Sequence, residues 1–299
     1  MSLGVLNNLS AVYAENNLTN TNNSLSKTLQ QLSSGSKINS GADDAAGLSI
    51  VDGLQANQQA LNQSQTNAQE GVGLLQVADG ALSQVTSLLN RAVTLATEAS
   101  NGTLTGAQST AANQEYQSIL AEITNIGSTT TYNGAKVFSG TAVSIYTTDS
   151  STTGTATDSL TISKLGASAT GDTVGEAGGT IAIATNTISY TPTAGATLVG
   201  TDLTGTTTAK AALTALNSAV ADVAGQDGYI GAQINTLNSI SSVLSTQQEN
   251  VQSAQNAVQA TDYASATSAM SKYEILSQTG ISALAQANSV QQEVTKLLQ

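Results

Sequence analysis

The sequence predicts a mainly α-helical, hairpin-like chain. Long coiled-coil helices form from both termini, a β-hairpin lies beside these helices, and a short β domain lies at the turn. Three observations support this fold class. Apolar residues recur at every seventh position in both flanks, the composition changes twice along the chain, and the central zone has short β-like runs between glycine-rich turns. Sevens sustained over this length are typical of coiled-coil helices.

Each flank carries one long heptad row. The first consists of Leu54, Leu61, Ala68, Leu75, Leu82, Leu89 and Ala96, with Ala78, Val85 and Ala92 filling the three-four spacing over its second half. The second consists of Leu216, Val223, Ile230, Leu237, Leu244, Val251 and Val258. As one helix, residues 43–100 would reach roughly 85 Å. Gly71, Gly73 and Gly80 each cost about 1 kcal/mol relative to alanine, so a kink or break is a second expectation there.

The chain ends carry weaker apolar stripes, which we expect to pack between subunits. The stripes comprise Leu18, Leu25, Leu29 and Leu32 in the first segment, and Ala283, Ala287, Val290, Val294 and Leu297 in the last. Asparagines at 17, 20, 22 and 23 are poor helix formers. Isolated helices of this kind are marginal, so we expect the ends to be largely unfolded in the monomer and to order on assembly.

Turn signals separate these segments. Ser34-Gly35 ends the first helix, and Asp43 or Asp44 caps the next one. That capping role is preferred to a metal-binding carboxylate pair, because no further ligands cluster nearby. Asn101-Gly102 ends the long helix, and residues 111–126 resume a helix.

The outer elements are short and β-like. Residues 129–138 read as a hairpin with a type I′ turn at Asn133-Gly134. Four further runs with β character follow at 142–146, 159–163, 180–184 and 187–191. With almost no aromatic residues, this zone makes a small and marginal β unit.

We therefore expect three parts. Residues 1–41 with 268–299 form a terminal coiled coil. Residues 42–139 with 209–267 form a helical rod that includes the hairpin, and residues 140–208 form a β domain.

Composition excludes several function classes. The chain has no His and no Cys, which removes His- and Cys-dependent nucleophile arrangements, disulfides, and thiolate or imidazole metal sites. Its net charge is −12 and its eight cations are scattered, so no basic stripe supports nucleic-acid binding. We expect no cofactor. We also expect no membrane insertion, because no apolar run approaches the roughly 20 residues of a span. No cleaved secretory signal is found at the start, which by itself reads as cytoplasmic.

Several segments resemble the bacterial flagellins. The N-terminal resemblance rests on residues 32–47 (LSSGSKINSGADDAAG), 67–71, 78–82 and 132–136; the C-terminal one rests on residues 230–233, 249–250 and 284–288. It covers about 139 residues at one end and 91 at the other, whereas the middle zone matches nothing specific.

This resemblance implies a filament subunit that leaves the cell through the flagellar export apparatus, without a cleaved signal and with a flagellin chaperone. It also implies that the terminal coiled coil is the inner core of the filament, that the rod with its β-hairpin is the outer core, and that residues 140–208 are a variable, surface-exposed β domain. The expected location is therefore the extracellular flagellar filament, which reverses the cytoplasmic reading. Expected partners are further copies of the chain, the filament cap and the hook-associated proteins. The resemblance also implies a face for a vertebrate Toll-like receptor at Arg91, Leu95 and Glu122, with a subunit contact at Arg91 as the alternative.

The sequence departs from the family pattern in three places. Residues 255–262 and 235–237 lack the customary arginines, and Gln291-Gln292 stands where Pro-Gln is common. Salt bridges of other flagellins are therefore not transferred to these sites.

Three functions remain in view. The first is a propeller filament subunit, and the second is the related hook–filament junction protein. An enzyme has no constellation to rest on, whereas adhesion through the outer domain is open as an added role.

Overall fold

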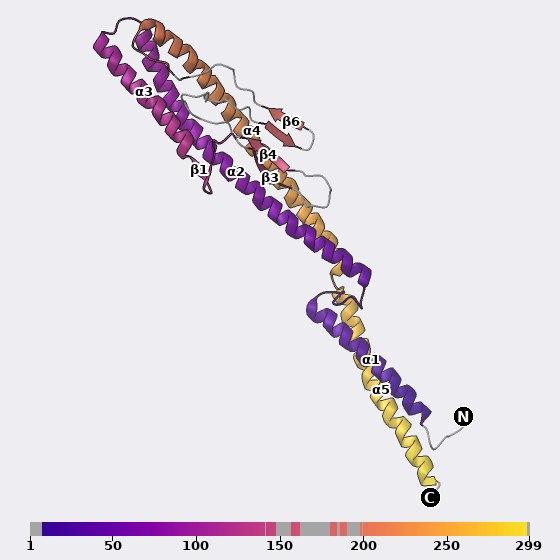
Figure 1. Cartoon of the computed structure of the whole chain (residues 1–299). Coiled ribbons are helices and arrows are strands. Elements are labelled where there is room, and N and C mark those ends of the chain that lie inside the picture. Colours follow the sequence, from indigo (N-terminus) through magenta and orange to yellow (C-terminus); the bar gives the residue numbers. More distant parts are fainter. Residues whose placement is uncertain are drawn as a thin grey trace. The chain divides into compact units, whose positions relative to one another are not determined.

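The computed structural model describes residues 8–140, 142–147, 157–161, 180–183, 186–189, 198 and 200–297 (Figure 1). The helices are α1 (Leu9–Ser34), α2 (Ala45–Ser100), α3 (Gly106–Thr129), α4 (Thr206–Gln259) and α5 (Tyr263–Leu297). The strands are β1 (Thr131–Tyr132), β2 (Ala135–Lys136), β3 (Ala142–Tyr146), β4 (Thr157–Thr161), β5 (Thr180–Ile183) and β6 (Asn186–Ser189). The predicted mainly helical fold with a small β part is confirmed.

The chain divides into two compact units. Unit 1 comprises residues 1–56 and 250–299, and unit 2 comprises residues 57–249. Helices α2 and α4 have residues in both units. The three-part division expected from composition stays a prediction.

The predicted heptad rows form the core of unit 2. In the α2 row, all six residues from Leu61 to Ala96 are buried, and in the α4 row the five residues from Leu216 to Leu244 are at most 4% exposed. The helices run antiparallel, because Asn62 bonds to Gln248 while Gly71 lies against Leu237. Helix α3 packs on the same core through Tyr116, Ile119, Leu120 and Ile123.

Helix α2 continues through its glycines without a break. At Gly71 a Cβ atom would collide with Cδ1 of Ile145, and at Gly73 it would lie 3.0 Å from Oη of Tyr132. Two of these glycines therefore leave room for side chains that cross over α2, and packing offsets their poor helix propensity.

Helix α3 begins five residues earlier than the predicted range of 111–126. Its start is fixed by a capping box, in which the Gln108 amide N–H donates to Oγ1 of Thr105 and the Thr105 N–H donates to Oε1 of Gln108. The helix also runs to Thr129, so the strands of the following hairpin are shorter than residues 129–138.

The hairpin has the predicted turn. Strands β1 and β2 pair antiparallel, and Asn133 (φ 49°) and Gly134 (φ 78°) both take the positive φ that a type I′ turn requires. The two residues that follow β2, Val137 and Phe138, are each 4% exposed and pack into the core of unit 2.

The predicted β runs of the middle zone agree closely with the observed strands. Strand β3 matches the predicted run 142–146, and it pairs antiparallel with β4, which begins two residues earlier than expected. Strands β5 and β6 form a second antiparallel pair. Residues 162–163, 184 and 190–191 of the predicted runs lie outside the described residues.

A short segment before α4, which we name the strap (Leu198 and residues 200–205), is fastened to α3. The Tyr116 hydroxyl lies 2.6 Å from Oγ1 of Thr201, and the Gln117 side-chain amide donates to the Thr201 carbonyl (2.8 Å). Two further bonds join Leu203 to Ser109 and Asn113. The side chains of Leu198 and Leu203 are 1% and 0% exposed, so the strap is part of the core.

Unit 1 is built on the pairing of α1 with α5. Helix α1 ends at Gly35, whose φ of 70° is readily adopted by glycine, and residues 36 and 260 form an antiparallel bridge beyond it. Asp44 is the residue that caps the next helix, because its Oδ1 accepts the Gly47 N–H (2.9 Å).

Candidate self-association surface

The α1–α5 pair has almost no core of its own. Among the described residues of these two helices, the buried side chains are those of Thr28 and Ala266. Unit 2, by contrast, contains the large buried cluster described above. A two-helix pair with so little burial has little to offset the entropy of ordering, about 1 to 2 kcal/mol per residue for the backbone.

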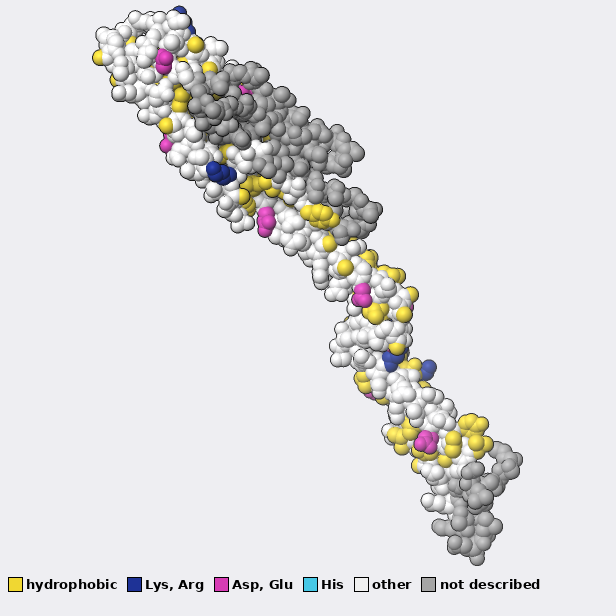
Figure 2. Space-filling model, in the orientation of Figure 1, with side chains coloured by type: hydrophobic (Ala, Val, Ile, Leu, Met, Phe, Trp, Pro, Cys, Tyr) yellow, Lys and Arg dark blue, Asp and Glu magenta, His cyan; other side chains and the backbone are white. Residues whose placement is uncertain are grey.

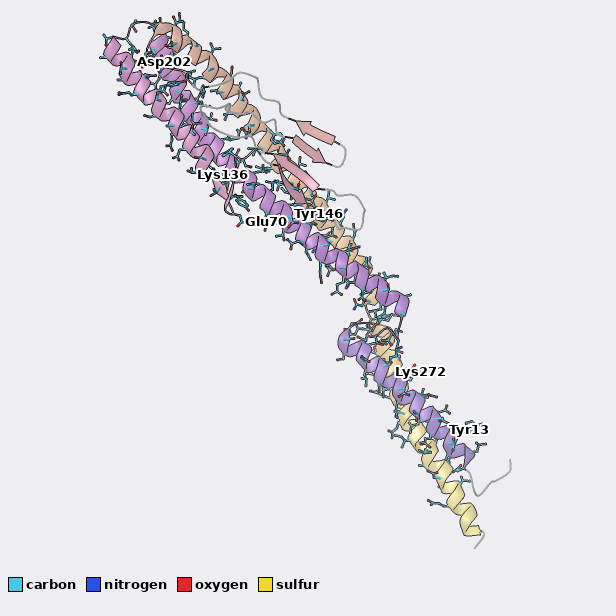
Figure 3. The ribbon with its side chains drawn as sticks, in the orientation of Figure 1. Tyr13, Glu70, Lys136, Tyr146, Asp202 and Lys272 are labelled. Carbon is cyan, nitrogen blue, oxygen red and sulfur yellow. The ribbon has the colours of Figure 1, made fainter. Side chains whose placement is uncertain are left out.

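The apolar side chains of this pair are largely turned outward. Exposed fractions are 63% for Leu9, 50% for Val12, 63% for Tyr13 and 46% for Leu29 on α1. On α5 they are 56% for Tyr263, 66% for Ile275, 43% for Leu276, 53% for Ile281 and 42% for Val290. Figure 2 shows hydrophobic side chains on the visible face of this unit, and Figure 3 shows Tyr13 projecting from α1. We name these nine residues the outward apolar set.

The predicted packing stripes divide between the inside and the outside of the pair. Leu18, Leu25 and Leu32 are half-buried, and Leu18 lies against Gly280 of α5. Leu29 and Val290 belong to the outward apolar set, and Ala283 is also exposed.

The remaining predicted positions lie at the chain end. Ala287 is half-buried, and its carbonyl accepts a hydrogen bond from Nδ2 of Asn8 (3.0 Å). The side chains of Val294 and Leu297 lie outside the described residues. The packing of all nine predicted residues between subunits stays a prediction.

Sequence reasoning missed part of the outward apolar set. Leu9, Val12 and Tyr13 have the i, i+3, i+4 spacing of one helix face. This spacing could have predicted that the three residues form one apolar face. Ile275 and Ile281 lie outside the heptad stripe that was followed, and only the pairing of α1 with α5 reveals that they face away from it.

Polar contacts hold the pair in register. Oγ of Ser277 donates to Oδ1 of Asn22 (3.1 Å), so at least one asparagine of α1 joins the two helices. A groove of about 480 Å³ runs between them, lined by residues that include Leu18, Tyr273 and Gly280. The pair is thus specified by small and polar contacts rather than by a large apolar seam.

The loop after α1 is tied back by an ion pair. Nζ of Lys27 lies 2.8 Å from Oδ1 of Asp43, and the other carboxylate oxygen accepts backbone N–H groups from Asn39 and Ser40. Lys27 and then these hydrogen bonds lower the pKa of Asp43 to about 2. The Asp43 carboxylate is therefore ionised at neutral pH, where it pairs with Lys27 and accepts these hydrogen bonds.

The three residues expected at a receptor face lie in different environments. Nε of Arg91 lies 2.7 Å from Oε1 of Glu115, and this contact lowers the pKa of Glu115 and raises that of Arg91. Arg91 and Glu122 are exposed, whereas Leu95 is 4% exposed and packs in the core of unit 2. Of these three residues, only Arg91 and Glu122 are therefore accessible to a partner protein.

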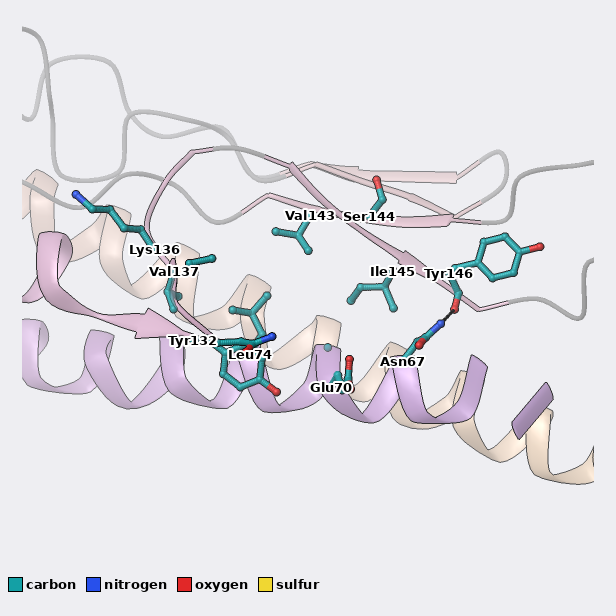
Figure 4. Close-up of a pocket in the computed structure, with 13 residues that line it drawn as sticks. Asn67, Glu70, Leu74, Tyr132, Lys136, Val137, Val143, Ser144, Ile145 and Tyr146 are labelled. Atoms are coloured by element: carbon teal, nitrogen blue, oxygen red, sulfur yellow. Dashed lines mark hydrogen bonds between the residues drawn. The ribbon is translucent and has the colours of Figure 1, made fainter. Parts of the chain in front are cut away.

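A pocket of about 410 Å³ lies in unit 2 between α2, the hairpin and β3 (Figure 4). Its walls include Leu74, Val137 and Ile145, and Nδ2 of Asn67 donates to the Tyr146 carbonyl (3.0 Å). Glu70 and Lys136 are the charged residues of its lining. In the part of the chain that the structure describes, no three Asp or Glu residues gather as a metal site.

Helix α2 is long and apolar enough to cross a membrane by length and composition alone. Within its most apolar stretch, 28% of the residues are buried inside the chain.

The chain resembles known proteins over most of its length. Residues 5–143 match the bacterial flagellin N-terminal helical region, and residues 213–298 match the bacterial flagellin C-terminal helical region. A flagellin of Listeria monocytogenes is 28% identical over 97% of this chain and 98% of that protein.

Other similarities are partial. Polar flagellin C of Vibrio parahaemolyticus is 38% identical over 140 residues, which are 47% of this chain but only 36% of that protein. A solved structure of a putative flagellar hook-associated protein from Vibrio parahaemolyticus has a TM-score of 0.51 at 18% identity, and covers 73% of this chain and 99% of that one. At that identity the likeness concerns the fold alone.

Proposed function

Because the chain belongs to the bacterial flagellin family, we propose that it is the structural subunit of a flagellar filament, that it polymerises with copies of itself outside the cell, and that it is not an enzyme. The observation that carries this proposal is the outward apolar set on α1 and α5. These side chains have no partner surface large enough within the pair, and neighbouring copies of the same helices would supply one.

The energetics favour assembly over folding of the isolated pair. Full burial of a large apolar side chain contributes about 1.5 to 3 kcal/mol. With roughly half of each of the nine side chains still exposed, completing their burial would contribute on the order of 10 kcal/mol per subunit before the entropic cost of association. Heterologous contacts that do not close then give an open helical polymer.

Seeded elongation tests this proposal directly. Purified chain is added to short filament fragments, and filament length is followed by negative-stain microscopy. Elongation is the expected result. Chain that adds once to a filament end and does not elongate it would favour the hook–filament junction protein instead.

Family membership also motivates finer proposals about partners. We infer that the chain leaves the cell through the flagellar export apparatus with a flagellin chaperone and without a cleaved signal, and that it meets the filament cap and hook-associated proteins. Loss of the chain from culture supernatants when the export apparatus is inactivated, with intracellular accumulation, is the expected result. Undiminished secretion would refute this route.

Recognition by a vertebrate Toll-like receptor is proposed only through the exposed pair Arg91 and Glu122. Arg91→Ala is expected to reduce receptor activation by the monomer, with Lys210→Ala on α4 as a charge-matched control. Equal receptor activation by the wild type, Arg91→Ala and Lys210→Ala would refute a role of Arg91 in recognition.

A further inference from the structure

The apolar seam between α2 and α4 contains polar residues over about two turns of α4. One seam position of α4 is apolar throughout unit 2, from Leu216 to Leu244. The second seam position also recurs every seven residues. It holds Ala212 and Ala219, and then Gln226 and Gln233. We name Gln226, Gln233 and the neighbouring Tyr229 the glutamine layer.

The side chains of this layer are buried, and Gln226 lacks the hydrogen bonds that its amide needs. Gln226, Gln233 and Tyr229 are 2%, 4% and 7% exposed. Neither amide atom of Gln226 has a hydrogen-bond partner among the described residues, whereas the Tyr229 hydroxyl and the Gln233 side chain interact with each other. Buried polar groups are nearly always paired, and an unpaired one weakens the packing around it.

The opposing helix does not supply partners. The contacts of Asn62 with Gln248 and of Gly71 with Leu237 fix the register of the two helices. That register places the glutamine layer opposite residues 75–82 of α2, where the buried side chains are Leu75, Ala78 and Leu82. At the same level Asp227 interacts with the carboxyl group of Asp79, and partial burial and then this carboxyl raise the pKa of Asp227.

The seam on either side of the layer is well packed. Toward one end, Leu237 fits against Gly71, so a large side chain meets a small one. Toward the other end, Leu216 and Val223 are 0% and 1% exposed, as are Val85 and Leu89 of α2, both at 0%. The weakness is therefore local and lies between two apolar stretches.

We propose that the glutamine layer is a built-in weak point of the α2–α4 seam, at which unit 2 yields when the filament is bent. The weak point concerns the single chain, whereas its effect on bending rests on the proposed function. A seam that is apolar on both sides keeps the helices paired while side chains in the layer rearrange.

The test replaces both glutamines in the full chain. Gln226→Leu/Gln233→Leu is the main variant, and Gln226→Met/Gln233→Met is a second variant with an unbranched side chain of similar length. Gln84→Leu, at an exposed position of α2, is the matched control. Hydrogen exchange of the monomer is measured by mass spectrometry for residues 222–233 and for the flanking residues 212–219.

In the wild-type monomer, residues 222–233 should exchange at least about tenfold faster than residues 212–219. The double variants should slow that exchange at least about tenfold, and Gln84→Leu should leave it unchanged. Filaments of the double variants should have a longer persistence length than wild-type filaments.

Three results would overturn the inference. Wild-type exchange at 222–233 that is no faster than at 212–219 would refute the weak point. So would faster exchange in both double variants, because the amides would then be paired in solution. Slower exchange with an unchanged persistence length would refute the role in bending. Wild-type chain that does not polymerise would refute the proposed function instead, and the monomer measurements would still decide the weak point.

Discussion

Among the residues whose exposure the structure describes, Ile275 is the most exposed large apolar side chain, and its truncation tests the proposed assembly surface. Ile275→Ala removes about three carbon groups, worth about 0.8 kcal/mol each when fully buried. Since 66% of the side chain is exposed in the chain, about 1.6 kcal/mol of that burial is left for assembly. A factor of ten in affinity corresponds to about 1.4 kcal/mol, so the critical concentration for polymerisation should rise about 15-fold.

The assay measures the monomer concentration that remains in equilibrium with filaments after sedimentation. Val243→Ala is the matched control, because Val243 is 56% exposed but lies on α4 in unit 2 among serine neighbours. Its effect should stay below about threefold, and thermal unfolding of unit 2 should be unchanged in both variants. An unchanged critical concentration for Ile275→Ala would refute the assignment of α5 to the assembly surface.

Three further predictions follow from unit 2. Deletion of residues 148–197 should leave polymerisation and the unfolding temperature of unit 2 nearly unchanged. Deletion of residues 140–208 should destabilise unit 2 by several kcal/mol, because Leu198 and Leu203 are lost from its core. Equal stability of the two deletion variants in calorimetry would contradict the role of the strap. Burial and the neighbouring Asp79 raise the pKa of Asp227, so its contribution to stability is present in acid and is lost as the pH rises through that pKa. Asp227→Asn should therefore raise the unfolding temperature at pH 7 and make little difference near pH 3, and the opposite trend would refute the carboxyl contact. Gly71→Val should destabilise unit 2 by about 2 kcal/mol or more through its collision with Ile145, while Gly80→Val, where no atom lies within 4 Å, should have the smaller cost of helix propensity alone; equal effects in urea unfolding would contradict this packing.

The parts of the fold that follow from local spacing were predictable. Leu75, Leu82 and Leu89 recur every seventh residue and are all fully buried. The Asn133-Gly134 turn followed from two residues that tolerate positive φ. Heptad rows and turns are determined by residues close together in the sequence, so their prediction does not need contacts between distant parts of the chain.

The rest depended on contacts between distant residues. The strap binds α3 through Thr201 and Tyr116, which are far apart in sequence and carry no shared motif. The glutamine layer has the heptad spacing of a core position but a polar residue type, so only burial distinguishes it from an exposed face. The outward apolar set likewise became visible only once α1 and α5 were paired.

We propose that the α1–α5 pair obtains its stability from neighbouring copies of the chain. Hydrogen exchange of residues 9–34 and 263–290 in monomer and in filament tests this most directly. We predict exchange near the rate of an unstructured peptide in the monomer, and protection greater by at least about a thousandfold in the filament. Equal protection of these residues in both states would contradict the account.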